Sequence, residues 1–269
     1  MTGVERITAA FARTDKRAAL MPYLMAGFPT LDESVRIGEA YIDAGADLLE
    51  VGVPYSDPLA DGPVIQAAGT AALAAGSNIA GVLEVARVLA AQVPVVLMCY
   101  ANMVYAPGAE LFVERLARSG ASGLIVPDLP LEEAQEVMEA CATHGLALVL
   151  MVAPTTTPER LTPIGANTTG FLYAISVVGT TGERKTGRPD FAGIIARAKA
   201  NTALPVALGF GVSTPEQAQE AVNAGADGII VGTRLVRAAS EAISKAEDPA
   251  STVADIVSEL SLALSSETG

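Results

Sequence analysis

A short unit recurs three times along the 269-residue chain: the end of a helical pattern, a glycine, and then a short apolar run. The three copies are YIDAGADLLEVGV (41–53), LARSGASGLIVPD (116–128) and AVNAGADGIIVGT (221–233). Glycine ends a helix readily because it can take the left-handed backbone conformation. The unit therefore predicts helices that alternate with strands, an arrangement that requires parallel strand pairing.

Five further apolar runs resemble these three strands. They cover residues 20–25, 94–100, 146–152, 170–176 and 205–209. Near-continuous apolar composition is typical of parallel strands buried on both faces. Eight such strands in one chain predict a (β/α)8 barrel, with residues 1–269 forming a single domain. A doubly wound sheet is the rival, but it usually has fewer strands and an obvious nucleotide-binding loop.

The connections carry recognisable helix starts. Thr30 with Glu33 and Ser213 with Glu216 match the capping-box pattern, and Thr157 precedes a first-turn proline. Residues 1–14 predict an extra N-terminal helix that closes the bottom of the barrel.

Composition narrows the classes of partner. The formal net charge is -13, whereas nucleic acids and anionic membranes require a basic face. Charged residues in the first 17 positions do not fit a signal peptide. Residues 62–83 and 88–109 lack charge, but polar residues and prolines interrupt them, so we expect buried soluble structure rather than membrane spans. The two cysteines, Cys99 and Cys141, are predicted to be buried thiols in a reducing cytoplasm.

Glu50 is the residue that least fits its surroundings, because it interrupts the apolar run LLEVGV. Side chains alternate along a strand, and Leu49, Val51 and Val53 form an apolar set that should face the helices. Glu50 then points into the barrel near the carboxyl end of its strand, where barrel enzymes place their active sites. A carboxyl group in apolar surroundings resists ionisation and suits proton transfer near neutral pH. The structural alternative is a glutamate paired with a buried lysine or arginine.

Three aspartates follow strands. Asp57 and Asp61 lie after the second strand, and Asp128 ends the fourth. Each precedes or adjoins proline or glycine, so a turn-forming or capping role is the simpler interpretation from the residues alone.

Glycine-bearing loops follow the last three strands at 179–182, 209–211 and 232–233. The last of these opens a predicted helix, TRLVRAASEAISK. Backbone N–H groups at a helix N-terminus bind phosphate without a cation, and barrels often build such a site after strands seven and eight. We therefore predict a short phosphate-binding helix after strand eight, although a glycine in a tight turn is the alternative for any single loop.

Several chemistries are disfavoured by what the sequence lacks. A single histidine, His144, argues against a zinc cluster or a Ser-His-Asp triad. No G-x-G-x-x-G motif opens a first helix, and no lysine at a strand end indicates a Schiff-base aldolase. Carboxylates, tyrosines and a phosphate cradle remain.

The motif EVGVPYSDPLADGP resembles the signature of the tryptophan synthase α subunit family. Further segments fall in the order of that family: MPYLMAGFP, LMCYANMVYAPG, IVPDLP, VAPTTTPERL, YAISVVGTTG, GFGVSTPEQ and IIVGTRLV. The resemblance spans essentially the whole chain. It implies retro-aldol cleavage of indole-3-glycerol phosphate to indole and glyceraldehyde 3-phosphate, with no metal and no cofactor in this chain.

The resemblance also implies roles for individual residues. Glu50 would be the acid and base, Asp61 would stabilise charge at the indole N–H, and Tyr173 would help position Glu50. Thr181 would close a lid onto Asp61. The phosphate would lie on Gly182, Gly211, Gly232 and Thr233. Candidates for the indole pocket, each of which is equally interpretable as a core residue, are Tyr23, Met98, Tyr100 and Leu124.

The family implies a partner as well. Its β subunit carries pyridoxal phosphate and receives indole through a tunnel, as part of a cytoplasmic α2β2 heterotetramer. The loops around Asp57 and Pro58, and around Asn102 and Tyr105, would form the contact surface. Two features depart from the family pattern: Tyr23 and Tyr55 often correspond to phenylalanine, and Arg184, Lys185 and Arg188 cluster in the sixth-strand loop.

Three rival functions stay open on sequence alone. A stand-alone indole-glycerol-phosphate lyase would keep every catalytic residue. Another phosphate-binding barrel isomerase would leave Glu50 without a task. A non-catalytic barrel that binds and regulates a partner would tolerate the loss of Glu50.

Overall fold

The strands of the computed structural model, which describes residues 1–13, 15–176, 190–209 and 211–266, pair in parallel in one sheet. Their order is β5-β4-β3-β2-β1-β9-β8-β7-β6. The strands are β1 (Ala19–Met25), β2 (Leu49–Gly52), β3 (Val95–Met98), β4 (Gly123–Ile125), β5 (Ala147–Val149), β6 (Met151–Val152), β7 (Leu172–Ile175), β8 (Val206–Gly209) and β9 (Gly228–Val231).

The sheet closes through the fifth predicted strand, which is split at Leu150. Its first half, β5, pairs with β4, and its second half, β6, pairs with β7. The split has a local cause, since the Leu150 N–H donates to the Thr168 hydroxyl (3.0 Å). One strand thus joins both edges of the sheet, and the predicted (β/α)8 barrel is confirmed, with eight expected strands appearing as nine segments.

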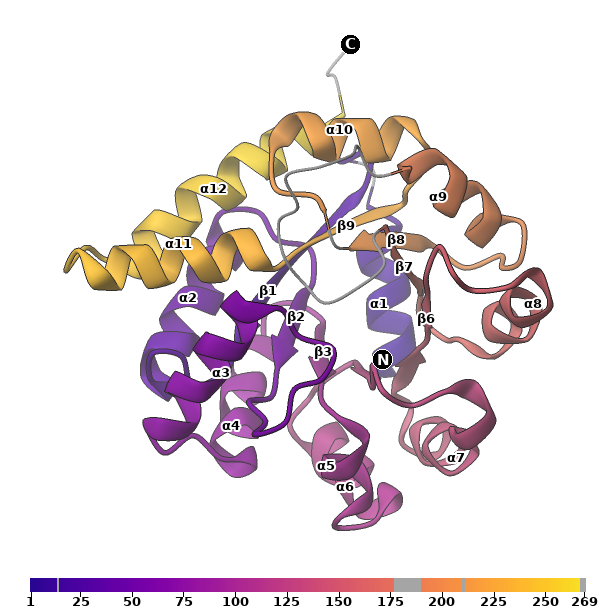
Figure 1. Cartoon of the computed structure of the whole chain (residues 1–269), viewed down its shortest axis with the longest axis horizontal. Coiled ribbons are helices and arrows are strands. Elements are labelled where there is room, and N and C mark those ends of the chain that lie inside the picture. Colours follow the sequence, from indigo (N-terminus) through magenta and orange to yellow (C-terminus); the bar gives the residue numbers. More distant parts are fainter. Residues whose placement is uncertain (14, 177–189, 210, 267–269) are drawn as a thin grey trace.

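Helices surround the strands (Figure 1). They are α1 (Gly3–Phe11), α2 (Leu31–Asp43), α3 (Pro63–Ala74), α4 (Ile79–Ala90), α5 (Ala101–Tyr105), α6 (Ala109–Arg118), α7 (Gln135–His144), α8 (Pro158–Asn167), α9 (Phe191–Lys199), α10 (Pro215–Asn223), α11 (Thr233–Ser244) and α12 (Pro249–Leu264), with a 3-10 turn at Leu131–Glu133. The helix expected after the eighth strand is α11, which at 12 residues is not short.

The predicted helix ends agree with the structure. Gly45, Gly120 and Gly225 directly follow the caps of α2, α6 and α10 with φ of 101°, 80° and 101°, the left-handed region that glycine enters at little cost. Thr30 caps α2 by accepting a hydrogen bond from the Glu33 N–H (3.2 Å). Only this half of the predicted capping box forms, since the Glu33 carboxylate accepts hydrogen bonds from Arg36 instead.

One predicted helix start was wrong by a residue. The capping box of α10 is formed by Thr214 and Gln217, not by Ser213 and Glu216. Two adjacent hydroxyl residues, Ser213 and Thr214, precede this helix. Gln217 serves the box as well as a glutamate does.

Apolar side chains form two main layers. Leu49, Val51 and Val53 belong to the large cluster between strands and helices, whereas Leu48 lies in the barrel interior with residues such as Met21 and Val96. The predicted alternation along β2 is therefore confirmed, and it directs Glu50 inward.

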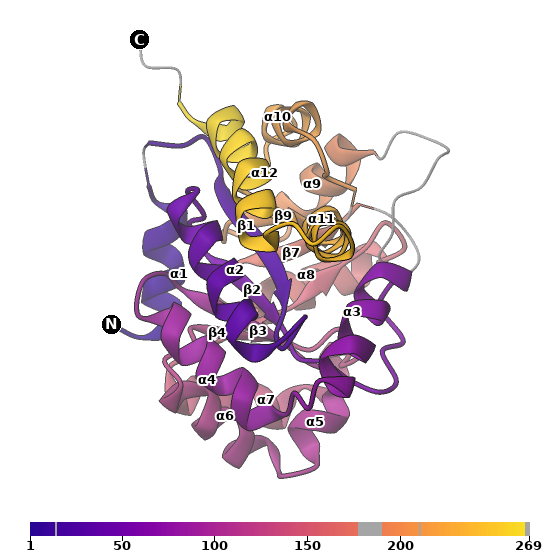
Figure 2. The same ribbon diagram turned by 90° about the vertical axis from the view of Figure 1, so that its left-hand side faces the viewer.

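Helix α1 closes the N-terminal end of the barrel. Ile7 is fully buried among interior residues, and the rings of Phe11 and Phe171 lie 5.4 Å apart. Figure 2 shows α1 at the opposite end of the strands from α3. The predicted closing helix is confirmed, and the other end of the barrel is left for the site.

Among the described residues, no single helix is long and apolar enough to cross a membrane. Helices α3 and α4 meet the length and composition together, but a 110° bend separates them. Each packs buried residues against the rest of the molecule, including Ile65 of α3 and Leu89 of α4.

Candidate active site

Glu50 lies in the middle of β2, 1% exposed, opposite Tyr23 of β1 and Val96 of β3. Its Oε1 has no hydrogen-bond partner within the described part of the chain. Burial, followed by the charge of Asp61, raises the pKa of Glu50 from 4.5 to about 8. A buried carboxylic acid that is mainly neutral at pH 7, with one oxygen free of hydrogen bonds, is equipped to donate a proton.

A second buried carboxylate, Asp47, shows what a structural acid looks like in this fold. Its Oδ2 accepts hydrogen bonds from the Lys16 ammonium (2.8 Å) and from the Leu20 N–H (2.9 Å). For Glu50, no salt bridge is present among the described residues. The alternative of a glutamate paired with a buried cation thus applies to Asp47 rather than to Glu50.

Asp61 lies in the loop between β2 and α3, partly buried. Burial raises its pKa to about 6, and hydrogen bonding to the Tyr100 hydroxyl partly opposes the rise. The same hydroxyl accepts a hydrogen bond from the Ala60 N–H (3.0 Å), and the Tyr100 ring stacks on Tyr55 with centroids 5.1 Å apart. These contacts hold the loop so that Asp61 faces Glu50, a role for both tyrosines that sequence reasoning missed.

Two other tyrosines enter the barrel interior beside Glu50. Tyr23 and Tyr173 are both buried, and the charge of Glu50 contributes to raising the pKa of each. Their rings lie across glycines of the next strand, because a Cβ built on Gly52 would overlap the Tyr23 hydroxyl and one on Gly209 would overlap that of Tyr173. The structure thus brings Tyr173 next to Glu50.

The four residues suggested for an indole pocket separate into two groups. Tyr23 and Met98 line the barrel interior, and Tyr100 adjoins Asp61. Leu124 does not join them, because it packs in the cluster between strands and helices. Its neighbour Ile125 faces inward beside Met98, so the assignment of Leu124 to the pocket is corrected to Ile125.

One predicted phosphate loop, 232–233, lies wholly within the described residues, and the loop 209–211 is described except for residue 210. Gly211 follows β8, exposed and with φ of 94°. Gly232 is the N-cap of α11, and Thr233 is its first residue, so the free N–H groups of that first turn point out of the helix end. Thr181 and Gly182, like the basic cluster Arg184, Lys185 and Arg188, lie outside the described residues.

The remaining candidate side chains form local hydrogen bonds or ion pairs. The Asp128 carboxylate accepts a hydrogen bond from the Ala101 N–H at the start of α5 (2.8 Å), and exposed Asp57 bonds the Ser56 hydroxyl in a turn (2.6 Å). His144 pairs with Glu110 at the surface (2.7 Å). The predicted burial of Cys99 and Cys141 is confirmed, and both are free thiols.

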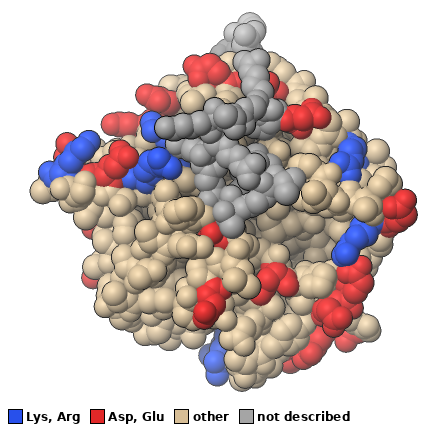
Figure 3. All heavy atoms as spheres, viewed as in Figure 1, with Lys and Arg blue, Asp and Glu red and all other residues tan. Residues whose placement is uncertain are grey.

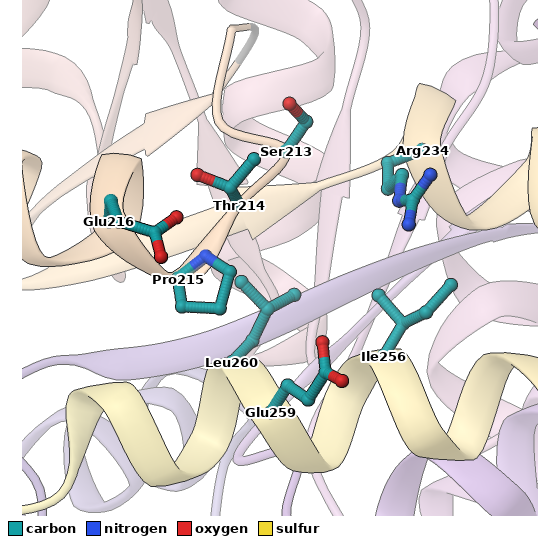
Figure 4. Close-up of a pocket in the computed structure, with 8 residues that line it drawn as sticks. All are labelled: Ser213, Thr214, Pro215, Glu216, Arg234, Ile256, Glu259 and Leu260. Carbon is teal, nitrogen blue, oxygen red and sulfur yellow. The ribbon is translucent and has the colours of Figure 1, made fainter.

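A cavity of about 420 Å³ lies between the start of α10, helix α11 and helix α12 (Figure 4). It is lined by Ser213, Thr214, Pro215, Glu216, Arg234, Ile256, Glu259 and Leu260. Two carboxylates against one guanidinium make it a poor place for a phosphate dianion. Its lining therefore differs in charge from the glycine-bearing loops predicted to bind phosphate.

The surface charge agrees with the composition. On the face seen in Figure 3, acidic side chains are spread around the rim, and lysines and arginines lie singly or in small groups among them. Among the described residues, no group of three or more histidine, cysteine or acidic side chains could hold a metal ion.

A family model described as tryptophan synthase alpha chain matches residues 10–264. The chain belongs to the tryptophan synthase alpha chain family. Curated alpha chains from Gloeobacter violaceus and Methanosarcina mazei are each 47% identical to it, over 236 and 231 residues. These matches cover 86% of both chains in the first case, and 85% of this chain and 84% of the relative in the second.

Solved structures of the tryptophan synthase family share the fold. A Mycobacterium tuberculosis tryptophan synthase chain aligns with a TM-score of 0.87 at 37% identity, covering 97% of this chain and 98% of the other. The tryptophan synthase subunit alpha of Legionella pneumophila gives a TM-score of 0.87 at 34% identity, with 98% of each chain covered. The resemblance noted in the sequence therefore extends over the entire barrel.

Proposed function

We propose that residues 1–269 work as one barrel domain that performs the reaction of the tryptophan synthase alpha chain family. This reaction is the retro-aldol cleavage of indole-3-glycerol phosphate to indole and glyceraldehyde 3-phosphate. The observation that supports the assignment of the chemistry is Glu50, an inward carboxyl group whose Oε1 has no hydrogen-bond partner among the described residues and whose pKa is raised to about 8.

Two carboxyl groups with different pKa values take different roles in the reaction. Near pH 7, Glu50 is mainly the neutral acid and Asp61, with a pKa of about 6, is mainly the anion. Such separation in one site assigns acid and base roles. Glu50 donates its proton to the ring carbon that carries the glycerol chain, while Asp61 accepts a hydrogen bond from the indole N–H and stabilises the positive charge of the ring.

The Glu50 carboxylate then removes the proton of the hydroxyl group next to the ring. The bond between the ring carbon and the carbinol carbon breaks, its electron pair returns to the ring, and the carbinol becomes the aldehyde. Glu50 ends the cycle protonated, as it began, so the reaction consumes no proton and requires no metal or cofactor.

The remaining residues bind and orient the substrate. Tyr173 positions Glu50, and the indole ring packs against the inward side chains Tyr23, Met98 and Ile125. Amide groups at Gly182, Gly211, Gly232 and Thr233 bind the phosphate, which a helix N-terminus can do without a cation. The family resemblance assigns closure over the site to Thr181, which lies outside the described residues.

The indole passes to a β subunit, which holds the pyridoxal phosphate of the family and converts indole to tryptophan in a cytoplasmic α2β2 complex. The loop after β2 suits the contact because it presents Leu59, 82% exposed, beside Asp57 and Pro58. Tyr105, at the end of α5, presents a further partly exposed ring.

The deciding experiment is indole release from indole-3-glycerol phosphate by the purified chain, with and without a tryptophan synthase β subunit. We expect slow release that rises sharply with the β subunit. Fast release that the β subunit does not change would indicate a stand-alone lyase instead. No release under either condition would refute the lyase function.

A further inference from the structure

The hydroxyl group of Tyr23 occupies a central place in the site that the steps above leave unused. Tyr23 is the β1 residue paired with Glu50 across the β1–β2 ladder. Its ring extends toward the carboxyl end of the barrel and lies across Gly52, two residues beyond Glu50 on the same face of β2. Only a glycine at position 52 leaves room for the phenol, because a Cβ there would overlap the hydroxyl.

This hydroxyl has a poor partner in the structure. It donates to the thioether sulfur of Met25 at 4.0 Å, and a thioether is a weak acceptor. On the neighbouring strand β2, the Oε1 atom of Glu50 has no hydrogen-bond partner among the described residues. A buried donor with a weak acceptor thus lies on the strand next to a buried carboxyl oxygen that lacks a donor. Each is costly to leave without a good partner, and a state of the site that joins them removes both costs.

The electrostatics of the site support the same pairing. The pKa of Tyr23 is raised well above its usual range by burial and then by the charges of Asp61 and Glu50. The hydroxyl therefore stays protonated and remains a donor. Because the charges of both Asp61 and Glu50 contribute to this pKa shift, the Tyr23 hydroxyl lies within the electrostatic influence of both carboxyl groups.

We propose that Tyr23 is a positioning residue for the acid–base group: its hydroxyl donates a hydrogen bond to the Glu50 carboxylate once Glu50 has given its proton to the substrate. This inference rests on the proposed function. The hydrogen bond matters most for the ionised Glu50 carboxylate that exists during the reaction. In an apolar interior, a hydrogen-bond donor stabilises this anion more than it stabilises the neutral acid.

The other groups around Glu50 differ from Tyr23 in chemistry or in position. Asp61 is an acceptor when ionised, and Val96 on the far neighbouring strand is apolar. The Tyr100 hydroxyl serves Ala60 and Asp61. Tyr173 also interacts electrostatically with Glu50, but it stands on β7, whereas Tyr23 lies on the strand paired directly with Glu50.

The test compares Tyr23→Phe with wild type over the pH profile of indole release. Loss of a hydrogen bond to the carboxylate should lower kcat about tenfold and move the basic limb of the profile upward by about one pH unit, with KM changed less than about twofold. Tyr41→Phe is the matched control. It removes another buried tyrosine hydroxyl, one that contacts the Tyr23 carbonyl from helix α2 (3.4 Å) on the helix side of the strand.

A second readout does not depend on turnover. Infrared titration of the Glu50 carboxyl, assigned by its absence in Glu50→Gln, should give a higher pKa in Tyr23→Phe than in wild type or Tyr41→Phe. An unchanged Glu50 pKa, an effect on KM alone, or equal losses in the two phenylalanine variants would overturn the inference. If wild type releases no indole, the proposed function fails, and the infrared shift still decides whether Tyr23 partners Glu50.

Discussion

The carboxylate of Asp61 acts directly on the ionisation of Glu50. After burial, the charge of Asp61 is the second cause that raises the pKa of Glu50 to about 8. Asp61 lies in the loop that follows β2, the strand that carries Glu50. Tyr100, between β3 and α5, holds that loop through hydrogen bonds with Ala60 and Asp61. The pKa of Glu50 therefore depends on the charge of Asp61, and the predictions about the two residues are linked.

Glu50→Gln should stabilise the fold in a pH-dependent way while abolishing cleavage. Because the folded pKa of Glu50 is above its ordinary value of 4.5, wild type loses stability as the pH rises from about 4.5 to about 8, whereas glutamine cannot ionise. The gain in unfolding free energy should be small at pH 5 and on the order of 3 kcal/mol near pH 7.

Urea unfolding of both proteins at pH 5, 7 and 8.5 measures this difference. Asp57→Asn, at an exposed carboxyl in the following loop, is the control and should show no comparable trend. A gap between Glu50→Gln and wild type that stays constant over the three pH values would contradict a raised pKa at Glu50.

Asp61→Asn should lower kcat by about two to three orders of magnitude, because the positive charge of the protonated ring loses its counter-ion. Removing this charge also lowers the pKa of Glu50, so the basic limb of the pH profile should move to lower pH. That direction is opposite to the one expected for Tyr23→Phe. For substrates whose indole ring is activated, the loss of kcat in Asp61→Asn should be smaller. Steady-state rates of indole release between pH 6 and 9 test this assignment. A basic limb at the same pH in Asp61→Asn and wild type would contradict it.

Ile7→Ala should destabilise the protein without changing the chemistry. Ile7 fills the N-terminal end of the barrel, and truncation of a buried isoleucine costs about 2–4 kcal/mol. Unfolding free energy and kcat should be measured together, with Ile7→Val as the conservative comparison at about 1 kcal/mol. A fall in kcat at temperatures where the variant is fully folded would mean that α1 influences the catalytic end.

Leu59→Ser should weaken activation by the β subunit and leave the basal rate of indole release unchanged. An exposed leucine in the loop after β2 is a candidate anchor for a partner, so the half-saturating concentration of β subunit should rise about tenfold. Leu262→Ser provides the control, since Leu262 is similarly exposed (75%) on α12. Equal behaviour of the two variants would place the contact elsewhere.

The sequence alone specified the features that depend on local chemistry. Glycines at 45, 120 and 225 could be interpreted as helix ends because the left-handed conformation favours glycine over other residues. The inward direction of Glu50 followed from alternation, since Leu49 and Val51 mark the opposite face of its strand. The family resemblance then added the roles of residues that no local pattern distinguishes.

Tertiary structure decided what a uniformly apolar strand cannot reveal. Both faces of the segment GLIV at 123–126 are buried, so no polar residue shows which face points into the barrel. Only the register of β4 with β3 places Ile125, rather than Leu124, on the inward face. The same packing brought Tyr23 across Gly52 and Tyr100 against Asp61. These contacts join residues of different strands and loops, and their distances depend on barrel closure, which no local pattern encodes.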